Sequence, residues 1–281
     1  MWKFIKSLSS TKMAAAVRKN RALKSLVKLY YMTVMFPFSR GGVAVNIGGA
    51  GEYKLDYMFA LSRYENFGDR HNAGFRKWLE ACRQAKVVFD VGAHIGLYAI
   101  PASGVIPQGG FVYAFEPSAT NRKYFKKHLE YNRISNIILL PYLVGDAMNK
   151  RQSFYESRAV DPTNSLNPKK NIGRYSKVFR EQITLDNFAK EHQIKPDVIK
   201  IDVEGAEYNV LRGADEILKK YSPAIFLSVH PAQLSLCGAS AGQLKDIISQ
   251  SGYRIWDSNG AEAQDIEFGE YVLLPRGRSG I

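Results

Sequence analysis

The stretch from Lys86 to Pro117, KVVFDVGAHIGLYAIPASGVIPQGGFVYAFEP, constrains the fold of this chain more than any other. Its β-branched and aromatic residues from Val87 to Phe89 predict a short buried strand that Asp90 closes. A glycine turn follows, then a helical pattern, and the run from Phe111 to Phe115 predicts a second strand. This order is half of a Rossmann-like unit, which predicts an α/β fold with a mostly parallel sheet.

The turn after the first strand has the spacing D-x-G-x-x-x-G, in which Gly92 and Gly96 bracket Ala93, His94 and Ile95. Glycine tolerates positive φ and, because it has no Cβ, lets a ligand approach the backbone closely. A dinucleotide site needs G-x-G-x-x-G, and His94 stands where the second glycine would be. The methionine tail of S-adenosylmethionine needs no such clearance, so the turn favours S-adenosylmethionine over NAD. A tight turn that binds no ligand is the alternative.

Two acids follow later strands of the same unit. Pro117 disfavours the helical region for Glu116, so the Glu116 carboxylate should stay at the strand end, above the crevice where open α/β sheets bind ligands. There it can accept hydrogen bonds from both hydroxyls of a ribose. Asp146 follows a third hydrophobic strand predicted over residues 136–144 and would lie near the adenine amino group. A turn-forming Gly145–Asp146 pair is an equally good explanation.

The second informative stretch runs from Asp197 to Gly213, DVIKIDVEGAEYNVLRG, and predicts a buried strand that Asp202 ends. Asp202, Glu204 and Glu207 then lie within six positions at the edge predicted for Asp90 and Glu116. Because like charges repel, a cation, a substrate hydroxyl or a neighbouring basic group should balance them; Lys200 and Arg212 are the candidates.

A functional role is the favoured interpretation of Asp202. For Glu207 the favoured interpretation is stabilisation of a helix predicted over residues 206–220, whose amino end attracts negative charge. A fifth strand predicted over Ala224 to Val229 ends at His230, and parallel neighbours would bring His230 close to Asp202. Histidine there can act as a base or a metal ligand, and a structural histidine is an equal alternative.

The formal net charge of +13 is concentrated in residues 1–40, which contain nine Lys and Arg and no Asp or Glu. Apolar residues recur there at helical spacing, which predicts a basic amphipathic helix in contact with anionic lipid head groups. Its longest apolar stretch, Leu29 to Phe38, is half of the roughly twenty residues that a spanning helix needs. A helix packed on the main domain and an organellar targeting segment are the alternatives.

The other segments complete the predicted organisation. Residues 41–85 should form a hairpin and a helix that lead into a main domain over residues 86–281. The polar stretch from Lys150 to Arg180 should be an irregular or hairpin insertion that can cover the site. Asp186 should cap a helix over 187–192, and an antiparallel pair should close the chain. Cys82 and Cys237 have no metal spacing, so we expect no metal site and a reducing, cytoplasmic compartment.

Taken in order, DVGAHIGLY, AFEP, ITLDNF and IKIDVEGAEYNVLRGA resemble the FkbM family of S-adenosylmethionine-dependent methyltransferases, from Lys86 to Leu274. The resemblance implies a class I methyltransferase fold, a seven-stranded mostly parallel sheet with an antiparallel C-terminal strand, here with a helical N-terminal extension. It implies a cofactor site with Asp90, Gly92 and Gly96 around the methionine moiety and Glu116 on the ribose. Ala93, His94 and Asp146 are the other candidates for this site. His94 stands where the family usually has Asn, a difference that is compatible with cofactor binding. Ser228 stands where the family often has an acid, and this second difference weakens the case for a metal or base on the fifth strand.

The resemblance also implies O-methylation, commonly of a sugar or polyketide hydroxyl. The base would be His230 or Asp202, with Glu204 shaping the acceptor site. Val203, Glu204 and Gly205 stand where methyltransferases acting on amino groups of nucleic acids commonly have a Pro-Pro-aromatic turn, so nucleic acid is disfavoured. A nucleic-acid methyltransferase or binding protein that uses the basic arm, and a non-catalytic membrane-associated module, are the alternatives.

Overall fold

The computed structural model describes residue 20 and residues 41–60, 62–69, 72–157, 159–161, 163–166 and 175–278. The basic amphipathic helix predicted over residues 1–40 therefore lies outside the described residues, apart from Asn20. Of the helices in the described ranges, none is long and apolar enough to cross a membrane.

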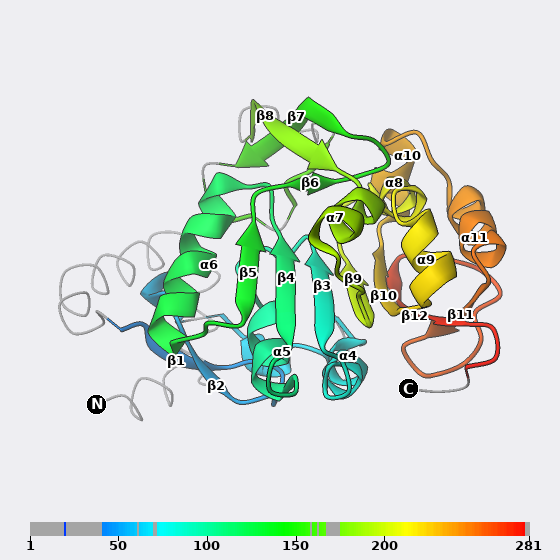
Figure 1. Cartoon of the computed structure of the whole chain (residues 1–281). Helices are drawn as coiled ribbons and strands as arrows, with labels where there is room; N and C mark the ends of the chain where they lie inside the picture. Colours follow the sequence, from blue (N-terminus) through cyan, green and yellow to red (C-terminus); the bar gives the residue numbers. More distant parts are fainter. Residues whose placement is uncertain are drawn as a thin grey trace.

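A seven-stranded sheet in the order β11-β12-β10-β9-β3-β4-β5 forms the centre of the molecule (Figure 1). Strands β3, β4, β5, β9 and β10 run parallel, and β12 is antiparallel to both of its neighbours. The predicted fold class is thus confirmed. The strands are β3 (Val87–Val91), β4 (Phe111–Phe115), β5 (Ile137–Leu140), β9 (Val198–Ile201), β10 (Ala224–Val229), β11 (Tyr253–Asp257) and β12 (Gly269–Pro275).

Helices cover both faces of this sheet, because successive side chains of a buried strand point to opposite faces. Val88 of β3 enters a core with α4 and α5, whereas Phe89 enters a second core with α7, α8 and α9. The helices are α4 (Phe75–Cys82), α5 (Ala99–Val105), α6 (Ala119–Asn132), α7 (Leu185–His192), α8 (Glu207–Arg212), α9 (Asp215–Tyr221), α10 (Pro231–Leu236) and α11 (Ala241–Gln250), with 3₁₀ turns η3 (Tyr57–Phe59) and η4 (Tyr64–Asn66).

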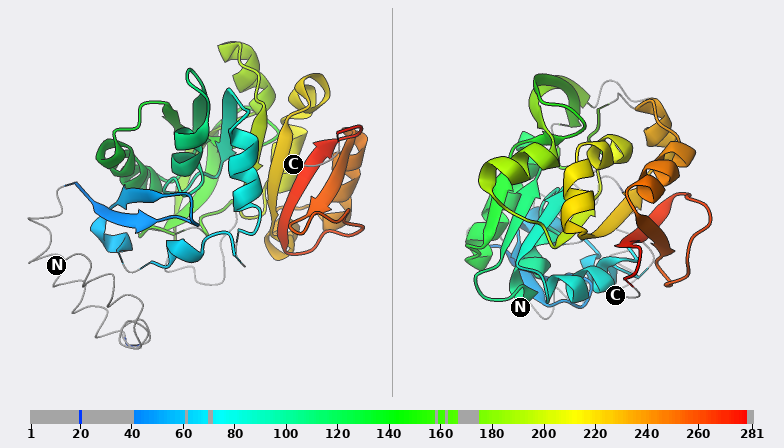
Figure 2. Two further views of the ribbon diagram at one scale, coloured as in Figure 1. Left: turned by 90° about the horizontal axis from the view of Figure 1, so that it is seen from below. Right: turned by 45° about the vertical axis from the view of Figure 1, so that its right-hand side comes forward.

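The predicted hairpin before the core is present as β1 (Val43–Asn46) and β2 (Glu52–Leu55), paired antiparallel. It lies beside α6, and Lys54 and Asn132 exchange hydrogen bonds between the two elements. Figure 2 shows this hairpin at the opposite side of the molecule from β11 and β12.

The third predicted strand is wrong as one element. It divides at Pro141 into β5 and β6 (Leu143–Val144), because proline cannot donate a ladder hydrogen bond. Strand β6 leaves the main sheet and pairs with β8 (Tyr175–Ile183), which also pairs with β7 (Asn149–Ser157). The polar stretch from Lys150 to Arg180 was predicted to be an irregular or hairpin insertion, and the antiparallel pair β7–β8 shows that it is a hairpin.

Two further predictions need correction. The single helix predicted over 206–220 is two helices, because Gly213 packs against the backbone of Gly145, where a Cβ would lie 2.0 Å from the carbonyl oxygen. Asp186 does not cap α7, whose N-cap is Thr184. Its carboxylate instead accepts hydrogen bonds from the backbone N–H groups of Glu216 and Ile217, at 3.0 and 2.9 Å, in the first turn of α9.

Candidate active site

The turn after β3 is shaped by close approach of its own chain. Gly92 has a φ of +86°, and a Cβ there would lie 1.9 Å from the backbone oxygen of Asp202. Gly96 has a φ of +94°, and its Cβ would lie 2.4 Å from the Phe125 ring. Both glycines are thus required by packing, and the first brings the end of β9 against the turn. The backbone N–H groups of Gly92 and Ala93 both donate to the Phe115 carbonyl.

Glu116 is buried at the end of β4, and the adjoining backbone holds its carboxylate in place. Oε2 accepts from the backbone N–H of His94 at 2.7 Å, and Oε1 accepts from that of Ser118 at 2.8 Å and from the Asn121 side chain at 3.3 Å. Burial raises the pKa of Glu116 to about 7, although these hydrogen bonds oppose the shift. The carboxylate therefore ties the glycine turn to the start of α6.

Asp90 is buried at the end of β3, and its Oδ2 accepts no hydrogen bond from any described residue. Burial raises the pKa of Asp90 to about 7; the neighbouring Lys200 opposes this shift and Asp202 adds to it. A buried carboxylate oxygen with no partner is costly, so this position is suited to a hydrogen-bond donor or a cation brought by a ligand.

His94 adopts a left-handed conformation, with a φ of +51°. Histidine and asparagine both visit this region more readily than most residues, so His94 can replace the Asn that the family usually has. Burial lowers the pKa of His94 to about 4, so the ring is neutral, and its Nε2 is buried without a hydrogen bond among the described residues.

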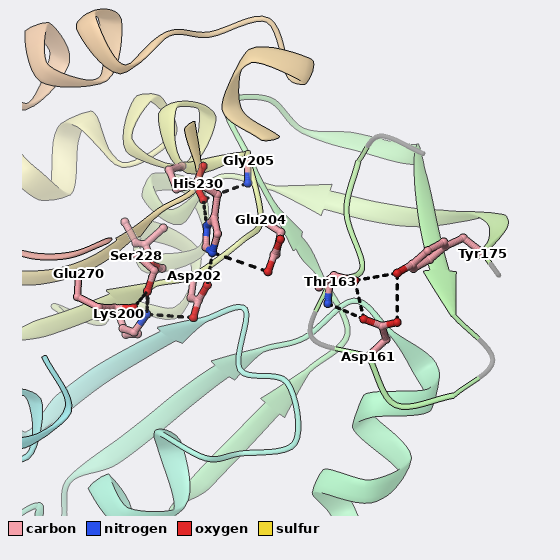
Figure 3. Close-up of polar contacts among 12 residues, drawn as sticks. Asp161, Thr163, Tyr175, Lys200, Asp202, Glu204, Gly205, Ser228, His230 and Glu270 are labelled. Carbon is pink, nitrogen blue, oxygen red and sulfur yellow. Dashed lines mark hydrogen bonds and ion pairs between the residues drawn. The ribbon is translucent and has the colours of Figure 1, made fainter. Parts of the chain in front are cut away.

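The strand ends of β9 and β10 bring together His230 and three acids (Figure 3). The Nδ1 atom of His230 lies 2.9 Å from Oε1 of Glu207, and Nε2 lies 3.8 Å from Asp202 and 3.7 Å from Glu204. A carboxylate only accepts hydrogen bonds, so Nδ1 carries the proton and Nε2 faces the other two acids. Burial alone would lower the pKa of His230, but the Glu207 hydrogen bond and the three negative charges outweigh it and raise the pKa.

Glu207 was expected only to stabilise a helix terminus. It does lie in the first turn of α8, and its Oε1 accepts from the backbone N–H of Gly205 at 3.0 Å. The same oxygen orients His230, although Glu207 is completely buried. In the sequence, His230 directly follows β10, and Glu207 begins the helix that follows β9. Because these two strands are parallel neighbours, their order could have indicated this second contact.

A second cluster lies beneath the first, around the buried ammonium group of Lys200 (Figure 3). Lys200 Nζ donates to Ser228 Oγ at 2.5 Å, lies 3.4 Å from Asp202 and 4.0 Å from Glu270, and stands 4.7 Å from the centre of the Tyr98 ring. Ser228 in turn donates to Glu270 at 2.8 Å. Burial would lower the pKa of Lys200, but Asp202, Glu270 and Asp90 raise it. Lys200 thus balances the acids as expected.

The other proposed cation, Arg212, is used elsewhere. It forms an ion pair at 3.0 Å with Asp146, on the surface between β6 and β7. Asp146 lines neither the large cleft nor the small hollow at this edge of the sheet, and its contact with an adenine amino group stays a prediction.

Two neighbouring hollows open at this edge of the sheet. The larger, a cleft of about 1280 Å³, is lined on its polar side by Asp90, Asp202, Glu204, Ser228, His230 and Glu270, and elsewhere by apolar residues such as Met58 and Phe67. The smaller, about 50 Å³, is lined by Glu116, Asn121 and Tyr142 among others. Gly92, His94, Asp202 and Glu204 line both hollows. Ligand pockets usually measure roughly 300–1,000 Å³, so the cleft has room for two reactants side by side.

No group of three or more His, Cys, Asp or Glu with the geometry of a metal site occurs in the described part of the chain. The fifth strand carries Ser228 where the family often has an acid, and the Ser228 hydroxyl is bonded to Lys200 and Glu270.

The family follows from comparison with known proteins. The sequence model of the Methyltransferase FkbM domain matches residues 90–255, which is more than half of the chain. The protein belongs to the FkbM methyltransferase family. Among curated proteins, the hexuronic acid methyltransferase AglP of Haloferax volcanii is 25% identical over 156 residues, which cover 55% of this chain and 60% of AglP. The match thus spans less than two thirds of that relative.

Solved structures of other methyltransferases are similar to this FkbM protein at a lower level. The FkbM methyltransferase of Methylobacillus flagellatus KT has 20% identity and a TM-score of 0.45, over 68% of this chain and 44% of that one. The O-methyltransferase TomG of Streptomyces achromogenes has 10% identity and a TM-score of 0.42, over 74% and 81%.

Proposed function

We propose that this FkbM protein transfers a methyl group from S-adenosylmethionine to a hydroxyl group of a sugar, a glycan or a related small-molecule or lipid-linked acceptor. The observation that carries the proposal is the His230–Glu207 pair, whose Nε2 faces a cleft large enough for two reactants. The similarity to a hexuronic acid methyltransferase supports a sugar acceptor.

The buried acids fit this cofactor chemically. Asp90 Oδ2 has no hydrogen-bond donor among the described residues, and it would accept from the ammonium group of the methionine moiety. Glu116 keeps lone pairs for ribose hydroxyls, since each carboxylate oxygen can accept more than one hydrogen bond. Ala93 and His94 would border the methionine moiety between these two acids. The donor and acceptor types at this edge therefore suit S-adenosylmethionine.

Bound S-adenosylmethionine would supply a methyl group on a positively charged sulfur. The sulfur is a good leaving group, so the methyl group can be transferred by direct displacement. The protein has to align the acceptor oxygen with the methyl group and remove one proton. In its neutral form His230 accepts the hydroxyl proton at Nε2 as the new carbon–oxygen bond forms and the sulfur–carbon bond breaks. Glu207 holds the Nδ1–H and stabilises the imidazolium that results.

Calorimetric titration with S-adenosylhomocysteine tests the cofactor site. Wild type should bind it saturably and NAD should not bind, and Glu116→Ala should lose the binding. If folded wild type does not bind S-adenosylhomocysteine, the proposal fails. A screen of sugar and lipid-linked acceptors with methyl-labelled S-adenosylmethionine then tests the reaction.

We also propose that residues 1–40 bring the protein to anionic membrane surfaces. The support is their nine basic residues without an acid and the helical spacing of their apolar residues. Flotation with anionic and neutral liposomes tests this by comparing full-length protein with a chain that starts at Gly41. Equal flotation of the two would reject it, and tight salt-sensitive RNA binding without lipid preference would favour a nucleic-acid partner.

A further inference from the structure

Phe268 is an exposed aromatic ring at the mouth of the cleft. Its exposed fraction is 69%, although it lies among residues that line the cleft. The ring meets that of His230 edge to face, with centroids 5.7 Å apart and an interplanar angle of 70°. A large apolar side chain left in water beside a reactive group suggests a surface for a ligand.

The position of Phe268 follows from strand register. Gly269 pairs with Val229 across β12 and β10, so the residues next to them, Phe268 and His230, leave the sheet at the same point. The preceding loop is fixed by Tyr271, whose hydroxyl accepts from the backbone N–H of Glu267 at 2.9 Å. The ring is therefore exposed on an anchored backbone.

The acids beside His230 leave room for hydroxyl groups. The separations of Nε2 from Asp202 and Glu204, 3.8 and 3.7 Å, exceed a direct hydrogen bond. One hydroxyl of a ligand can donate a hydrogen bond to the carboxylate of Asp202 or Glu204, while a neighbouring hydroxyl of the same ligand approaches Nε2 of His230. Asp90 Oδ2, assigned above to the cofactor, lines the same cleft, so cofactor and acceptor would lie side by side in it.

We propose that the acceptor is a sugar ring that packs its apolar face on Phe268 and donates adjacent hydroxyls to Asp202 and Glu204. This arrangement presents one hydroxyl to Nε2 of His230. Phe268 is then a positioning residue that selects rings with an apolar face and neighbouring hydroxyls. The inference rests on the proposed function and names the residues that position the acceptor within it.

Saturation-transfer NMR tests the platform on full-length protein loaded with S-adenosylhomocysteine. The probes are the methyl glycosides of glucose, mannose and glucuronic acid, with 1-butanol as a hydroxyl compound that has no ring. We expect transfer to the ring protons of at least one glycoside and none to butanol. Phe268→Ala should weaken glycoside binding roughly tenfold, whereas Phe268→Trp should keep it.

Leu236→Ala is the matched control, because Leu236 is 60% exposed on α10 and does not line the cleft. It should bind the glycoside as wild type does. With an accepted glycoside as substrate, Phe268→Ala should raise KM about tenfold and change kcat little, as expected for binding lost equally from ground and transition states.

The failures are distinguishable. Wild type that does not bind S-adenosylhomocysteine would overturn the methyltransferase proposal and this inference with it. Wild type that binds S-adenosylhomocysteine but none of the glycosides, or binds butanol equally well, would overturn the sugar platform alone. Unchanged glycoside binding by Phe268→Ala would do the same.

Discussion

The Lys200 cluster and the His230 cluster share Asp202 but differ in their access to water. Lys200 is 1% exposed, and its ammonium group is enclosed by Ser228, Asp202, Glu270 and the Tyr98 ring. His230 has one nitrogen held by Glu207 and the other directed to the cleft. Side chains of the protein surround the charged group of the Lys200 cluster, whereas Nε2 in the His230 cluster faces the cleft.

This difference shows how the enzyme can keep several acids at one sheet edge. The enclosed cation lies below Asp202 and compensates negative charge from inside the protein. Asp202 thus lies between the cation below it and His230 above it. Compensating charge with a buried cation and exchanging a proton at a buried histidine that borders the cleft, as proposed for His230, are separate tasks. The following four predictions test that separation.

The largest effect should come from the open cluster. His230→Gln should lower kcat by roughly a hundredfold to ten-thousandfold, because a positioned general base contributes about that much. Its affinity for S-adenosylhomocysteine should be unchanged in calorimetry. His192→Gln is a suitable control, since His192 stacks on Phe188 of α7 and does not line the cleft. A kcat within a few-fold of wild type would remove His230 as the base and leave Asp202 as the candidate.

The next effect concerns the enclosed cluster. Lys200→Met should lower the free energy of unfolding by about 3–5 kcal/mol, because it leaves the buried Asp90 and the partly buried Asp202 and Glu270 without their cation. Urea denaturation measures the change. Lys219→Met is the matched control: Lys219 pairs with Asp215 at 2.7 Å on an exposed helix face, and such a pair contributes at most about 0.5 kcal/mol. Equal free energies of unfolding for the two variants would show that Lys200 does not stabilise the fold.

A smaller effect should appear in the pH dependence of cofactor binding. The pKa values of Asp90 and Glu116 are raised to about 7, so both acids lose protons as pH rises through 7. Since folding raises these values, their contribution to stability is present in acid and lost as pH rises through about 7. Ligand donors should compensate the ionised acids, so S-adenosylhomocysteine should bind up to roughly tenfold more tightly at pH 8 than at pH 6.

Calorimetry at pH 6, 7 and 8 measures this dependence, with Asp90→Asn as the comparison. Asparagine is isosteric but does not titrate, so the variant should show a flatter profile. A wild-type affinity that is constant or falls over this range would contradict the role of the two acids.

The smallest effect should be a shift in the pH profile of the reaction. The pKa of His230 is raised by Glu207 and the neighbouring acids, so the acidic limb of kcat should lie above the ordinary range for histidine. Glu207→Gln keeps an oxygen that accepts from Nδ1–H but removes the charge. Its acidic limb should move to lower pH, with kcat reduced a few-fold. The low-pH stability contributed by protonated His230, which is lost as pH rises through its folded pKa, should also decrease.

The sequence predicted the elements that depend on strong local patterns. The alternation of buried strands with glycine turns and helices predicted the order of the main sheet elements, and the strand-end positions of Asp90, Glu116, Asp202 and His230 predicted that they share one edge. The structure places all four there.

The division of the third predicted strand has a local cause in Pro141, whereas the other errors concern contacts between segments that are distant in the chain. The break between α8 and α9 depends on Gly145 approaching Gly213, and Asp186 caps a helix other than its own. Glu270 reaches Lys200 only because β12 inserts beside β10. The periodicity of apolar residues describes one segment at a time, so it contains no information about contacts between distant segments.

The place of β12 also has a consequence for biosynthesis. A ribosome delivers Lys200 long before Glu270, and β12 must enter between β10 and β11, both of which emerge earlier. Until it does, β10 has an open edge and the ammonium group of Lys200 beneath His230 lacks one of its acids. A nascent chain that ends before Gly269 therefore cannot assemble the charge arrangement beneath His230, and competence for catalysis should be acquired late, as the sheet closes.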